Sequence, residues 1–377
     1  MRPLEGLLVI TLEQAVAAPY CTAKLVEAGA RVIKVERAEG DFARNYDAAA
    51  KGESSYFTWL NQGKESLTLN IVDAEDNALL RRLIGKADIL VQNFAPGVLD
   101  RLGFESDKLV DLNPRLITCN ITGYGTDPAI LQKRGYDLLV QAESGLISVS
   151  GAAGAPGRVG VSVCDIGTGM AAYSGILEAL FARDRTGVGS TVDISLFDMI
   201  AEWMSVPYLH ARYGAGAPLP VGLRHPSIAP YGAFACHDGR YVLLSIQNER
   251  EWVRLCDQVL GAPGMATDPR FASNNKRVEN RDALEAAMAE ITKRMTAAEF
   301  QAKLEEAKIA CGALNTVEDL MTHPALHTHT IGNSTGAPLR LPAPPVHHSF
   351  AENADAPGRT PRIGEHSDAI RREFADD

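Results

Sequence analysis

Short apolar runs alternate with longer amphipathic stretches along the first half of the chain. The run at 7–12 predicts a buried strand, the stretch at 19–29 a helix that ends at a glycine, and the run at 31–37 the next strand. The alternation continues, with strands expected at 65–71, 88–94, 115–125 and 190–198 and helices at 74–87, 169–185 and 199–214. Strand–helix–strand units of this kind build parallel sheets covered by helices. The pattern therefore predicts an α/β fold with a large, Rossmann-like parallel sheet.

The pattern changes after residue 213. A stretch rich in Gly and Pro at 213–232 has the character of a linker or lid, and "HDG" within 232–246 predicts a hairpin. Helices are expected at 249–260, 279–295 and 297–308, and a short one near the end of the chain. We therefore expect a large α/β domain at 1–213, a smaller α+β domain at 214–325 and a C-terminal segment at 326–377.

Composition and charge narrow the function classes. The chain has 37 Lys and Arg against 47 Asp and Glu, a formal net charge of −10, and no basic stripe interleaved with aromatic residues, so it does not resemble a general nucleic-acid binder. Its six cysteines are scattered without a CxxC pair, which fits reduced thiols and a cytoplasmic protein. No window reaches the ~18 apolar residues of a membrane span. We expect neither nucleic-acid nor membrane partners.

One carboxylate stands at a notable place, Asp165 in "VGVSVCDIGTGMAA", where an apolar run that predicts a strand meets a helical stretch. As the cap of a helix beginning near Thr168 it would stabilise that helix by about 1 kcal/mol, and position alone favours this interpretation. At the carboxyl end of a parallel strand it would instead face a ligand, with backbone N–H groups beside it to stabilise an oxyanion. The two roles are compatible.

The same stretch also contains "GTGMAA" (167–172), which matches the G-x-G-x-x-A dinucleotide fingerprint. Its place in the middle of the chain argues against that use, because the fingerprint opens the first strand–helix unit, and the acidic partner of the ribose is missing after the next strand. Close packing of the helix on the sheet is the alternative use of these glycines.

The histidines exclude other chemistry. All nine lie beyond residue 209, so the first α/β region has none to act as a base in a Ser-His-Asp arrangement. "THPALHTH" offers three histidines without a cysteine pair, and we predict no metal site. Cys164 is expected in the core. Four basic residues stand out in the first region: Arg37, Lys64, Arg101 and Arg134. Each one by itself is expected to be a surface charge. Three of the four lie near predicted strand ends, which suggests a shared anion site.

Several motifs, in consistent order over nearly the whole chain, resemble the family III CoA-transferases, the group of the formyl-CoA and carnitine CoA-transferases. The matching stretches include "GLLVITLEQAVAAPYCTAKLVEAGARVIKVERAEGD", "YFTWLNQGKESLTLNI", "ADILVQNFAPGVLDRLGF", "NPRLITCNITGYG", "RGYDLLVQAESGL", "GVGSTVDISLFD", "DPRFASNNKRVENRDAL" and "GEHSDAI". Any one of these stretches is a weak signal, whereas the ordered set is a strong one.

The resemblance implies an enzyme whose Asp165 carries first the acyl group and then CoA. It implies an interlocked homodimer whose C-terminal segment returns to the large domain, CoA thioesters and small carboxylic acids as substrates, and no cofactor beyond CoA. The residues that it assigns to CoA binding are Val16, Ala17, Arg37, Leu69, Asn93, Phe94, Arg101 and Arg134.

Two further residue pairs concern the substrate. The α-methylacyl-CoA racemases resemble the same large domain but carry "GHD" where this chain has "GYD", Tyr136 and Asp137 included. A phenol, with a reference pKa of about 10, is a poor base for racemisation, so transfer is favoured. The loop "GLRHPSIAP" lacks the glycine run of formyl-CoA transferases, which argues against an oxalate or formyl substrate. Arg224 and His225 in this loop suit the second carboxylate of a dicarboxylic acceptor such as itaconate, citramalate or mesaconate. Succinyl-CoA is then the expected donor. A lid loop with plain surface charges is an equally good interpretation, and a non-catalytic CoA-binding protein is the third function class.

Overall fold

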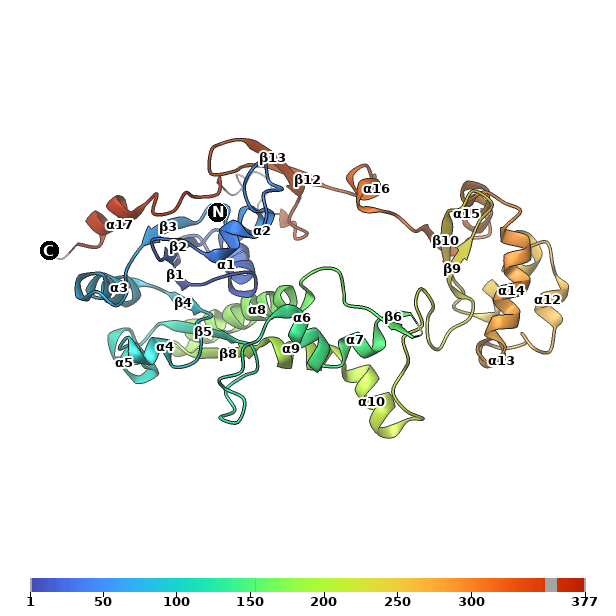
Figure 1. Ribbon diagram of the computed structural model, residues 1–377, viewed down its shortest axis with the longest axis horizontal. Coiled ribbons are helices and arrows are strands. Elements are labelled where there is room, and N and C mark those ends of the chain that lie inside the picture. Colours follow the sequence, from blue (N-terminus) through green and yellow to red (C-terminus); the bar gives the residue numbers. More distant parts are fainter. Residues whose placement is uncertain (1, 153, 350–357, 376–377) are drawn as a thin grey trace. The chain divides into compact units, whose positions relative to one another are not determined.

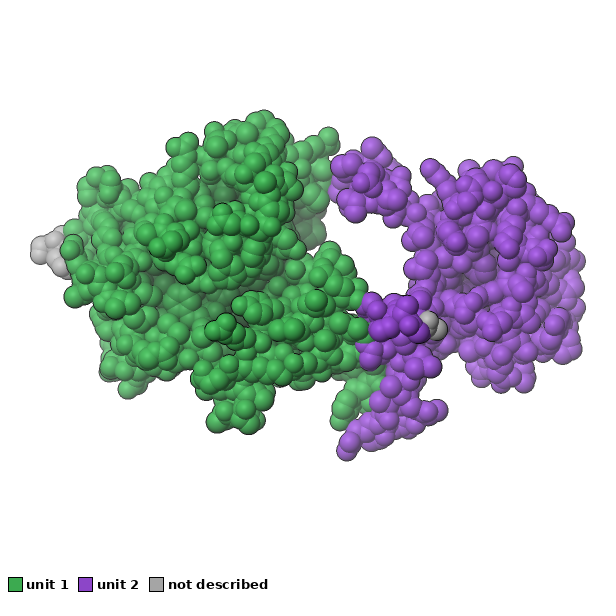
Figure 2. Space-filling model, in the orientation of Figure 1, with its two compact units in different colours: residues 1–147, 158–209, 327–377 green, residues 148–157, 210–326 purple. Residues whose placement is uncertain are grey.

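The computed structural model describes residues 2–152, 154–349 and 358–375. The chain forms two compact units (Figure 2): unit 1 consists of 1–147, 158–209 and 327–377, and unit 2 of 148–157 and 210–326. Each unit is described by itself. The segment 148–157, which the sequence placed in the large domain, belongs to unit 2.

Unit 1 is built on a parallel sheet of six strands in the order β3-β2-β1-β4-β5-β8 (Figure 1). The strands are β1 (Leu8–Leu12), β2 (Arg31–Glu36), β3 (Glu65–Thr68), β4 (Ile89–Gln92), β5 (Ile117–Thr122) and β8 (Thr191–Ser195). All six fall within runs for which the sequence predicts strands, and the predicted mixed α/β class is confirmed. Mostly apolar strands are buried on both faces, as parallel strands require.

Helices cover both faces of this sheet because neighbouring side chains of a strand point to opposite faces. Val9 packs in the core that α1 and α8 share, while Ile10 packs in the core on the other face, formed with α3, α5 and α17. The helices up to residue 213, with one 3-10 turn, are α1 (Ala17–Glu27), η1 (Phe42–Asn45), α2 (Ser55–Leu60), α3 (Ala74–Lys86), α4 (Val98–Arg101), α5 (Ser106–Leu112), α6 (Asp137–Glu143), α7 (Leu146–Val149), α8 (Val163–Thr186), α9 (Leu196–Trp203) and α10 (Ser205–Tyr213).

The C-terminal segment of unit 1 lies along the edge strand β3. It contains the hairpin β12 (Thr328–Gly332) and β13 (Pro338–Pro342) and the helix α17 (Ser367–Glu373). The N–H of Ser66 donates to Nδ1 of His366 at 3.1 Å, and the N–H of Thr68 donates to Oγ of Ser367 at 3.0 Å. These bonds satisfy edge-strand groups that would otherwise be open to pairing with another chain.

Unit 2 has its own antiparallel sheet and hydrophobic core. The sheet order is β11-β10-β9, and the predicted hairpin is confirmed as β9 and β10. Its elements are β6 (Gly151–Ala152), β7 (Ala155–Pro156), β9 (Tyr231–Ala235), β10 (Tyr241–Ser245), α11 (Glu249–Arg254), the π-helical turn η2 (Leu255–Val259), α12 (Gly264–Thr267), α13 (Asn274–Glu279), α14 (Arg281–Thr292), α15 (Ala297–Glu306), β11 (Ala310–Ala313) and α16 (Val317–Met321). Across the described ranges of both units, none of the helices combines the length and apolar character that crossing a membrane requires.

Candidate active site

Asp165 lies in the first turn of α8, which begins at Val163. The expectation of a strand leading up to Asp165 is wrong, because residues 157–162 form no strand and the helix starts five residues before the predicted Thr168. Asp165 is therefore neither the end of a strand nor a helix cap; the cap position is Ser162, which makes no side-chain capping bond. The apolar residues before Asp165 pack the start of α8 against the core: Val163 lies against it, and Cys164 is buried in it as expected.

The carboxyl group of Asp165 has no protein partner within the described residues: no hydrogen-bond donor and no cation pairs with it. Burial, and then the charge of Asp137, raise its pKa to about 7. A pKa near 7 means that the charged form of Asp165 is costly in the folded protein. Shifted carboxyls of this kind gather at functional sites, and here the shift falls on a partly exposed carboxyl that makes no hydrogen bond to another described residue.

Asp137 and Tyr136 lie beside this helix start. Tyr136 caps α6 and is 57% exposed, and Asp137 is the first residue of that helix. One oxygen of Asp137 accepts the N–H of Cys164 at 2.8 Å, and the other accepts from Nε2 of Gln141 at 2.7 Å. Asp137 is thus a fixed carboxylate that satisfies an N–H group at the amino end of α8, a place where negative charge is favourable.

The amino end of α1 packs against α8 close to Asp165. A Cβ on Gly169, one turn after Asp165, would lie 2.5 Å from the carbonyl oxygen of Ala17, so the backbones meet only because residue 169 is a glycine. Tyr20 also lies against Gly169. Near the other end of α8, Arg183 pairs with Asp88, which precedes β4, so α8 runs from the carboxyl ends of the strands toward their amino ends, as α1 does between the parallel strands β1 and β2. The helices therefore run in the same direction, and Asp165 lies at the same end as the first turn of α1.

That end of α1 offers free hydrogen-bond donors. Among the residues that the structure describes, the N–H groups of Val16, Ala17 and Ala18 have no acceptor. The loop that leads to them holds Ala15 at φ 64°, a conformation that costs a residue with a Cβ about 1–2 kcal/mol. Such strain is kept where the surrounding structure fixes a particular backbone position.

A cavity of about 950 Å³ opens at the carboxyl ends of the strands of unit 1. The sheet order reverses between β1 and β4, which is where parallel α/β folds bind ligands. Five of the eight residues predicted to bind CoA line this cavity: Arg37, Leu69, Asn93, Phe94 and Arg101. The sequence did not single out other lining residues, among them Gln14, Thr68, Asn70 and Arg371, the last from α17.

Asn93 fixes the wall between this cavity and α1. Its Oδ1 accepts the N–H of Gln14 at 2.9 Å, and its Nδ2 donates to the carbonyl oxygen of Gln14 at 2.8 Å. An amide side chain that binds both backbone groups of one residue holds that residue in a defined orientation. The loop 14–17 therefore leads from the cavity to the helix contact beside Asp165.

The other predicted CoA-binding residues lie elsewhere in unit 1. Val16 and Ala17 are buried at the start of α1, and Arg134 is on an exposed loop outside the cavity lining. The suggestion that Lys64 shares an anion site with the arginines is wrong: Lys64 is fully buried and pairs with Glu13 at 2.7 Å. Its charge is already neutralised inside the protein, whereas Arg37 and Arg101 do meet at one cavity.

Arg224 and His225 belong to unit 2 and have partners there. Arg224 pairs with Glu285 at 2.5 Å and lies 3.8 Å from Asp282. The His225 ring stacks on Tyr231 with 5.1 Å between ring centroids. Their role toward a substrate carboxylate stays a prediction.

The dinucleotide interpretation of 167–172 does not hold, because both glycines lie inside α8 rather than in a strand-to-helix turn. Gly167 packs closely against Met199 and Trp203 of α9, and Gly169 packs closely against α1. Close helix packing therefore explains both glycines. Within the described ranges no group of three His, Cys, Asp or Glu side chains is arranged to hold a metal ion.

Comparison with known proteins places these features in a family context. The model of the family described as CoA-transferase family III matches residues 4–367. The chain is similar to an acetyl-CoA:oxalate CoA-transferase of Acetobacter aceti, with 37% identity covering 99% of this chain and 96% of that protein. It is also similar to the human succinyl-CoA:glutarate CoA-transferase, with 30% identity covering 99% and 86%. Among solved structures, a CAIB/BAIF family protein from Brucella suis superposes with a TM-score of 0.85 at 34% identity, covering 99% of both chains.

Proposed function

This chain belongs to CoA-transferase family III, and from that premise we propose that it moves CoA from an acyl-CoA, succinyl-CoA first among the candidates, to a small dicarboxylic acid. The observation that carries the proposal is the carboxyl of Asp165, which has no partner among the described residues and lies at the amino end of α8. The amino end of α1, with its free N–H groups, lies at the same end. Covalent transfer through this carboxyl is the chemistry that suits such an arrangement.

The reaction proceeds in four displacements at Asp165. Its carboxylate oxygen attacks the thioester carbonyl of the donor, the C–S bond breaks, and a mixed anhydride and CoA thiolate form. The thiolate attacks the Asp165 carbonyl, which releases the donor acid and leaves an Asp165–CoA thioester. The acceptor carboxylate attacks that thioester to give a second anhydride and thiolate. The thiolate then attacks the acceptor acyl carbon, which yields the new acyl-CoA and restores the carboxylate.

The surroundings of Asp165 support each of these steps. A carboxyl without a cation or donor keeps its electron pairs available for attack, and proximity to a bound thioester replaces a bimolecular encounter. Each displacement passes through a tetrahedral oxyanion. The N–H groups of Val16, Ala17 and Ala18 are the donors that we assign to it, since fixed backbone donors stabilise charge that develops in the transition state.

CoA occupies the cavity at the carboxyl ends of the strands in this proposal. Its phosphates are anions, and Arg37 and Arg101 are lining cations suited to them by charge, whereas a third lining cation, Arg371, pairs with Asp76 at 2.6 Å. From the cavity, the loop 14–17 gives the pantetheine arm a path toward Asp165. No cofactor other than the CoA substrate enters the scheme.

The acceptor class follows from chemistry that the named relatives share. The oxalate and glutarate in their names are both dicarboxylic acids, so the absence of a glycine run from the loop "GLRHPSIAP", which argues against oxalate, does not narrow the acceptor within this class. An acceptor of this class uses one carboxylate for attack and leaves the other for recognition. Mesaconate, itaconate and citramalate belong to the same class.

An interlocked homodimer in the cytoplasm completes the proposal. Large apolar side chains stay exposed along α8 and α9, with Phe181 at 61% and Trp203 at 52%, as expected of a face that another subunit covers. Light scattering coupled to size exclusion would return twice the 40.5 kDa chain mass.

The direct test is covalent trapping. Succinyl-CoA is incubated with the enzyme and a panel of oxalate, glutarate, mesaconate, itaconate and citramalate, and the CoA esters and the peptide containing Asp165 are analysed by mass spectrometry. We expect a new acyl-CoA and, after hydroxylamine or borohydride, a modification at Asp165. Asp165→Asn should lose turnover, whereas Asp184→Asn, an exposed aspartate on the same helix, should retain it. Turnover at the normal rate by the Asp165→Asn variant would refute the mechanism.

A second assay distinguishes CoA transfer from the racemase reaction. A 2-methylacyl-CoA in deuterated water without any acceptor exchanges its α-hydrogen in a racemase and keeps it in a transferase. Exchange without transfer would assign the racemase reaction to this site, and CoA binding without either would assign a non-catalytic role.

A further inference from the structure

Two acidic and two basic side chains are buried together beside the start of α1. Glu13 follows β1, Lys34 lies in β2, Asp41 follows β2, and Lys64 precedes β3; their side chains are at most 1% exposed. Lys64 lies 2.7 Å and Lys34 lies 3.3 Å from Glu13, and Lys34 lies 2.9 Å from Asp41. We call these four residues the buried ionic cluster.

The charges in this cluster persist although burial opposes them. Against the effect of burial, Lys64 and Lys34 hold the pKa of Glu13 down at about 2, while burial lowers the pKa of Lys64 to about 8. Removing ions from water is expensive, and well-packed apolar residues often replace a buried ion pair without loss of stability. The cluster therefore calls for an explanation other than stability.

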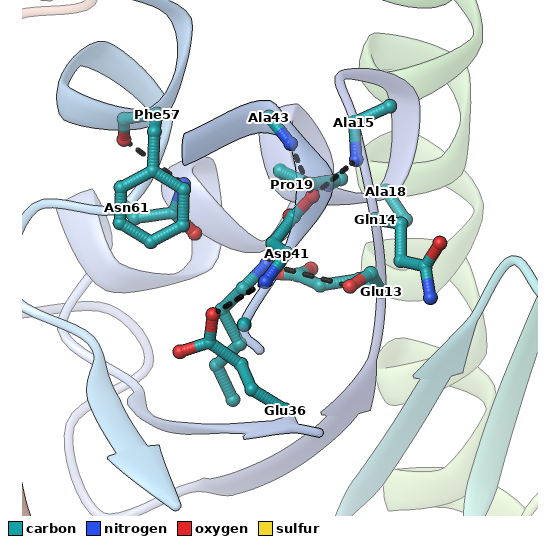
Figure 3. Close-up of polar contacts among 12 residues, drawn as sticks. Glu13, Gln14, Ala15, Ala18, Pro19, Glu36, Asp41, Ala43, Phe57 and Asn61 are labelled. Carbon is teal, nitrogen blue, oxygen red and sulfur yellow. Dashed lines mark hydrogen bonds and ion pairs between the residues drawn. The ribbon is translucent and has the colours of Figure 1, made fainter. Parts of the chain in front are cut away.

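The cluster fixes backbone at the start of α1. Oδ1 of Asp41 accepts the N–H of Ala15 at 3.2 Å and that of Ala43 at 2.9 Å (Figure 3). Its Oδ2 pairs with Lys34 at 2.9 Å. The N–H of Asp41 in turn donates to Glu36 at 3.0 Å. Ala15 is the residue held in the left-handed conformation, so Asp41 binds the strained point of the loop.

The first two turns of α1 are held from the same cluster. Nζ of Lys64 donates to the carbonyl oxygen of Pro19 at 3.1 Å, and Oε2 of Glu13 accepts from Oγ1 of Thr22 at 2.6 Å. Figure 3 shows Glu13, Pro19 and Asp41 gathered around the turn into α1. Loop and helix are thus attached to one set of charges.

The held backbone meets the helix of the reactive carboxyl at one close contact. Ala17 packs on Gly169, one turn from Asp165, with no room for a Cβ. A shift of the loop would therefore move the α1 donors relative to Asp165.

We infer that the buried ionic cluster positions the loop 14–16 for catalysis, with Asp41 as the positioning residue that keeps Ala15 in its strained conformation. Asp41 acts through the backbone of α1 and touches no reacting atom. The inference rests on the proposed function, because it assumes that chemistry occurs at Asp165 between α8 and the amino end of α1.

The test compares Asp41→Asn with Asp88→Asn, a change at a partly exposed carboxylate of the same sheet. Asp41 accepts two backbone N–H groups and pairs with Lys34, whereas Asp88, whose side chain is 28% exposed, accepts the N–H of Leu8 at 2.9 Å and pairs with the buried Arg183 at 3.1 Å. For Asp41→Asn we expect kcat about 100-fold lower with KM for succinyl-CoA changed less than threefold, because a small displacement of catalytic donors is that costly. Asp88→Asn should lower the melting temperature and leave kcat within threefold.

A rescue experiment separates positioning from general destabilisation. Glycine adopts the left-handed conformation without strain, so Ala15→Gly added to Asp41→Asn should restore kcat at least tenfold. An Asp41→Asn enzyme that folds and keeps kcat within threefold overturns the inference, and so does one whose loss Ala15→Gly does not reverse.

Gly169→Ala keeps the inference testable where Asp41→Asn fails to fold. Its Cβ would press on the carbonyl oxygen of Ala17 and displace the start of α1, so kcat should fall with KM retained. Gly175→Ala on the same helix, which meets only the side chain of Val192, is the control. A Gly169→Ala enzyme with wild-type kcat overturns the inference. Wild-type protein that transfers CoA to none of the acids tested instead refutes the proposed function.

Discussion

Asp137 accepts the N–H of Cys164 at 2.8 Å and so lies fixed beside the helix turn that carries Asp165. The two carboxyls are close enough that the charge of Asp137 adds to the effect of burial in raising the pKa of Asp165 to about 7. Asp137 thus has two effects at once: it favours the start of α8, and it tunes the acid that the helix presents.

The first prediction concerns the pH dependence of transfer. Only the carboxylate form of Asp165 attacks, so kcat/KM should rise with pH through about 7 and level off above it. In Asp137→Asn the neighbouring charge is absent, and the midpoint should move to lower pH. A pH–rate profile of both proteins measures the shift. Asp198→Asn, which alters the carboxylate that accepts from the hydroxyl of Ser195 at the start of α9, should leave the midpoint in place. An unmoved midpoint in Asp137→Asn would contradict this role.

The second prediction concerns the stability cost of Asp165. A carboxyl with a folded-state pKa of about 7 and an ordinary value of 3.8 contributes stability below pH 3.8 that is lost as pH rises through 7. Full conversion of this shift is about 4 kcal/mol, and partial exposure reduces it to about 2. Asp165→Asn should therefore melt higher than wild type at pH 8 and match it near pH 4. Equal differences at both pH values would exclude ionisation of Asp165 as the source of this cost.

The third prediction concerns the cavity arginines. Arg37→Gln and Arg101→Gln should each raise KM for succinyl-CoA about tenfold with little change in kcat, because they remove contacts made equally in ground and transition states. Arg372→Gln, an exposed arginine of α17 outside the cavity lining, serves as the matched control. Steady-state kinetics at fixed acceptor concentration measures KM for succinyl-CoA in each variant. An unchanged KM in both cavity variants would place the phosphates of CoA elsewhere.

The fourth prediction concerns acid sensitivity of the buried ionic cluster. The pKa of Glu13 is lowered from 4.5 to about 2, so its contribution is complete above pH 4.5 and is lost as pH falls through 2. This contribution should shrink by about 2 kcal/mol between pH 6 and pH 3. Urea unfolding of Glu13→Gln against wild type at the two pH values measures it. Glu178→Gln, an exposed residue of α8, should show no such change.

Periodicity alone determined the class of the large unit. Apolar runs that alternate with amphipathic stretches predicted all six strands of the sheet, and the helices α1 and α3 fall where they were expected. Local patterns suffice here because the central strands β1, β2 and β4 are almost wholly buried and α1 and α3 each bury one face, so the periodicity is strong. The ordered motifs added the family and singled out Asp165.

Tertiary structure alone decided what surrounds that residue. The run before Asp165 resembles a strand, but its residues serve the start of α8, whose packing against α1 overrides local propensity. Lys64 resembles Arg37 in sequence, yet one is buried against Glu13 and the other lines the cavity. Charge, burial and backbone strain at one point depend on residues far apart in the chain, which no local pattern contains. The sequence thus specified the elements and the reactive side chain, and the meeting of β1, β2, α1 and α8 specified the environment in which that side chain acts.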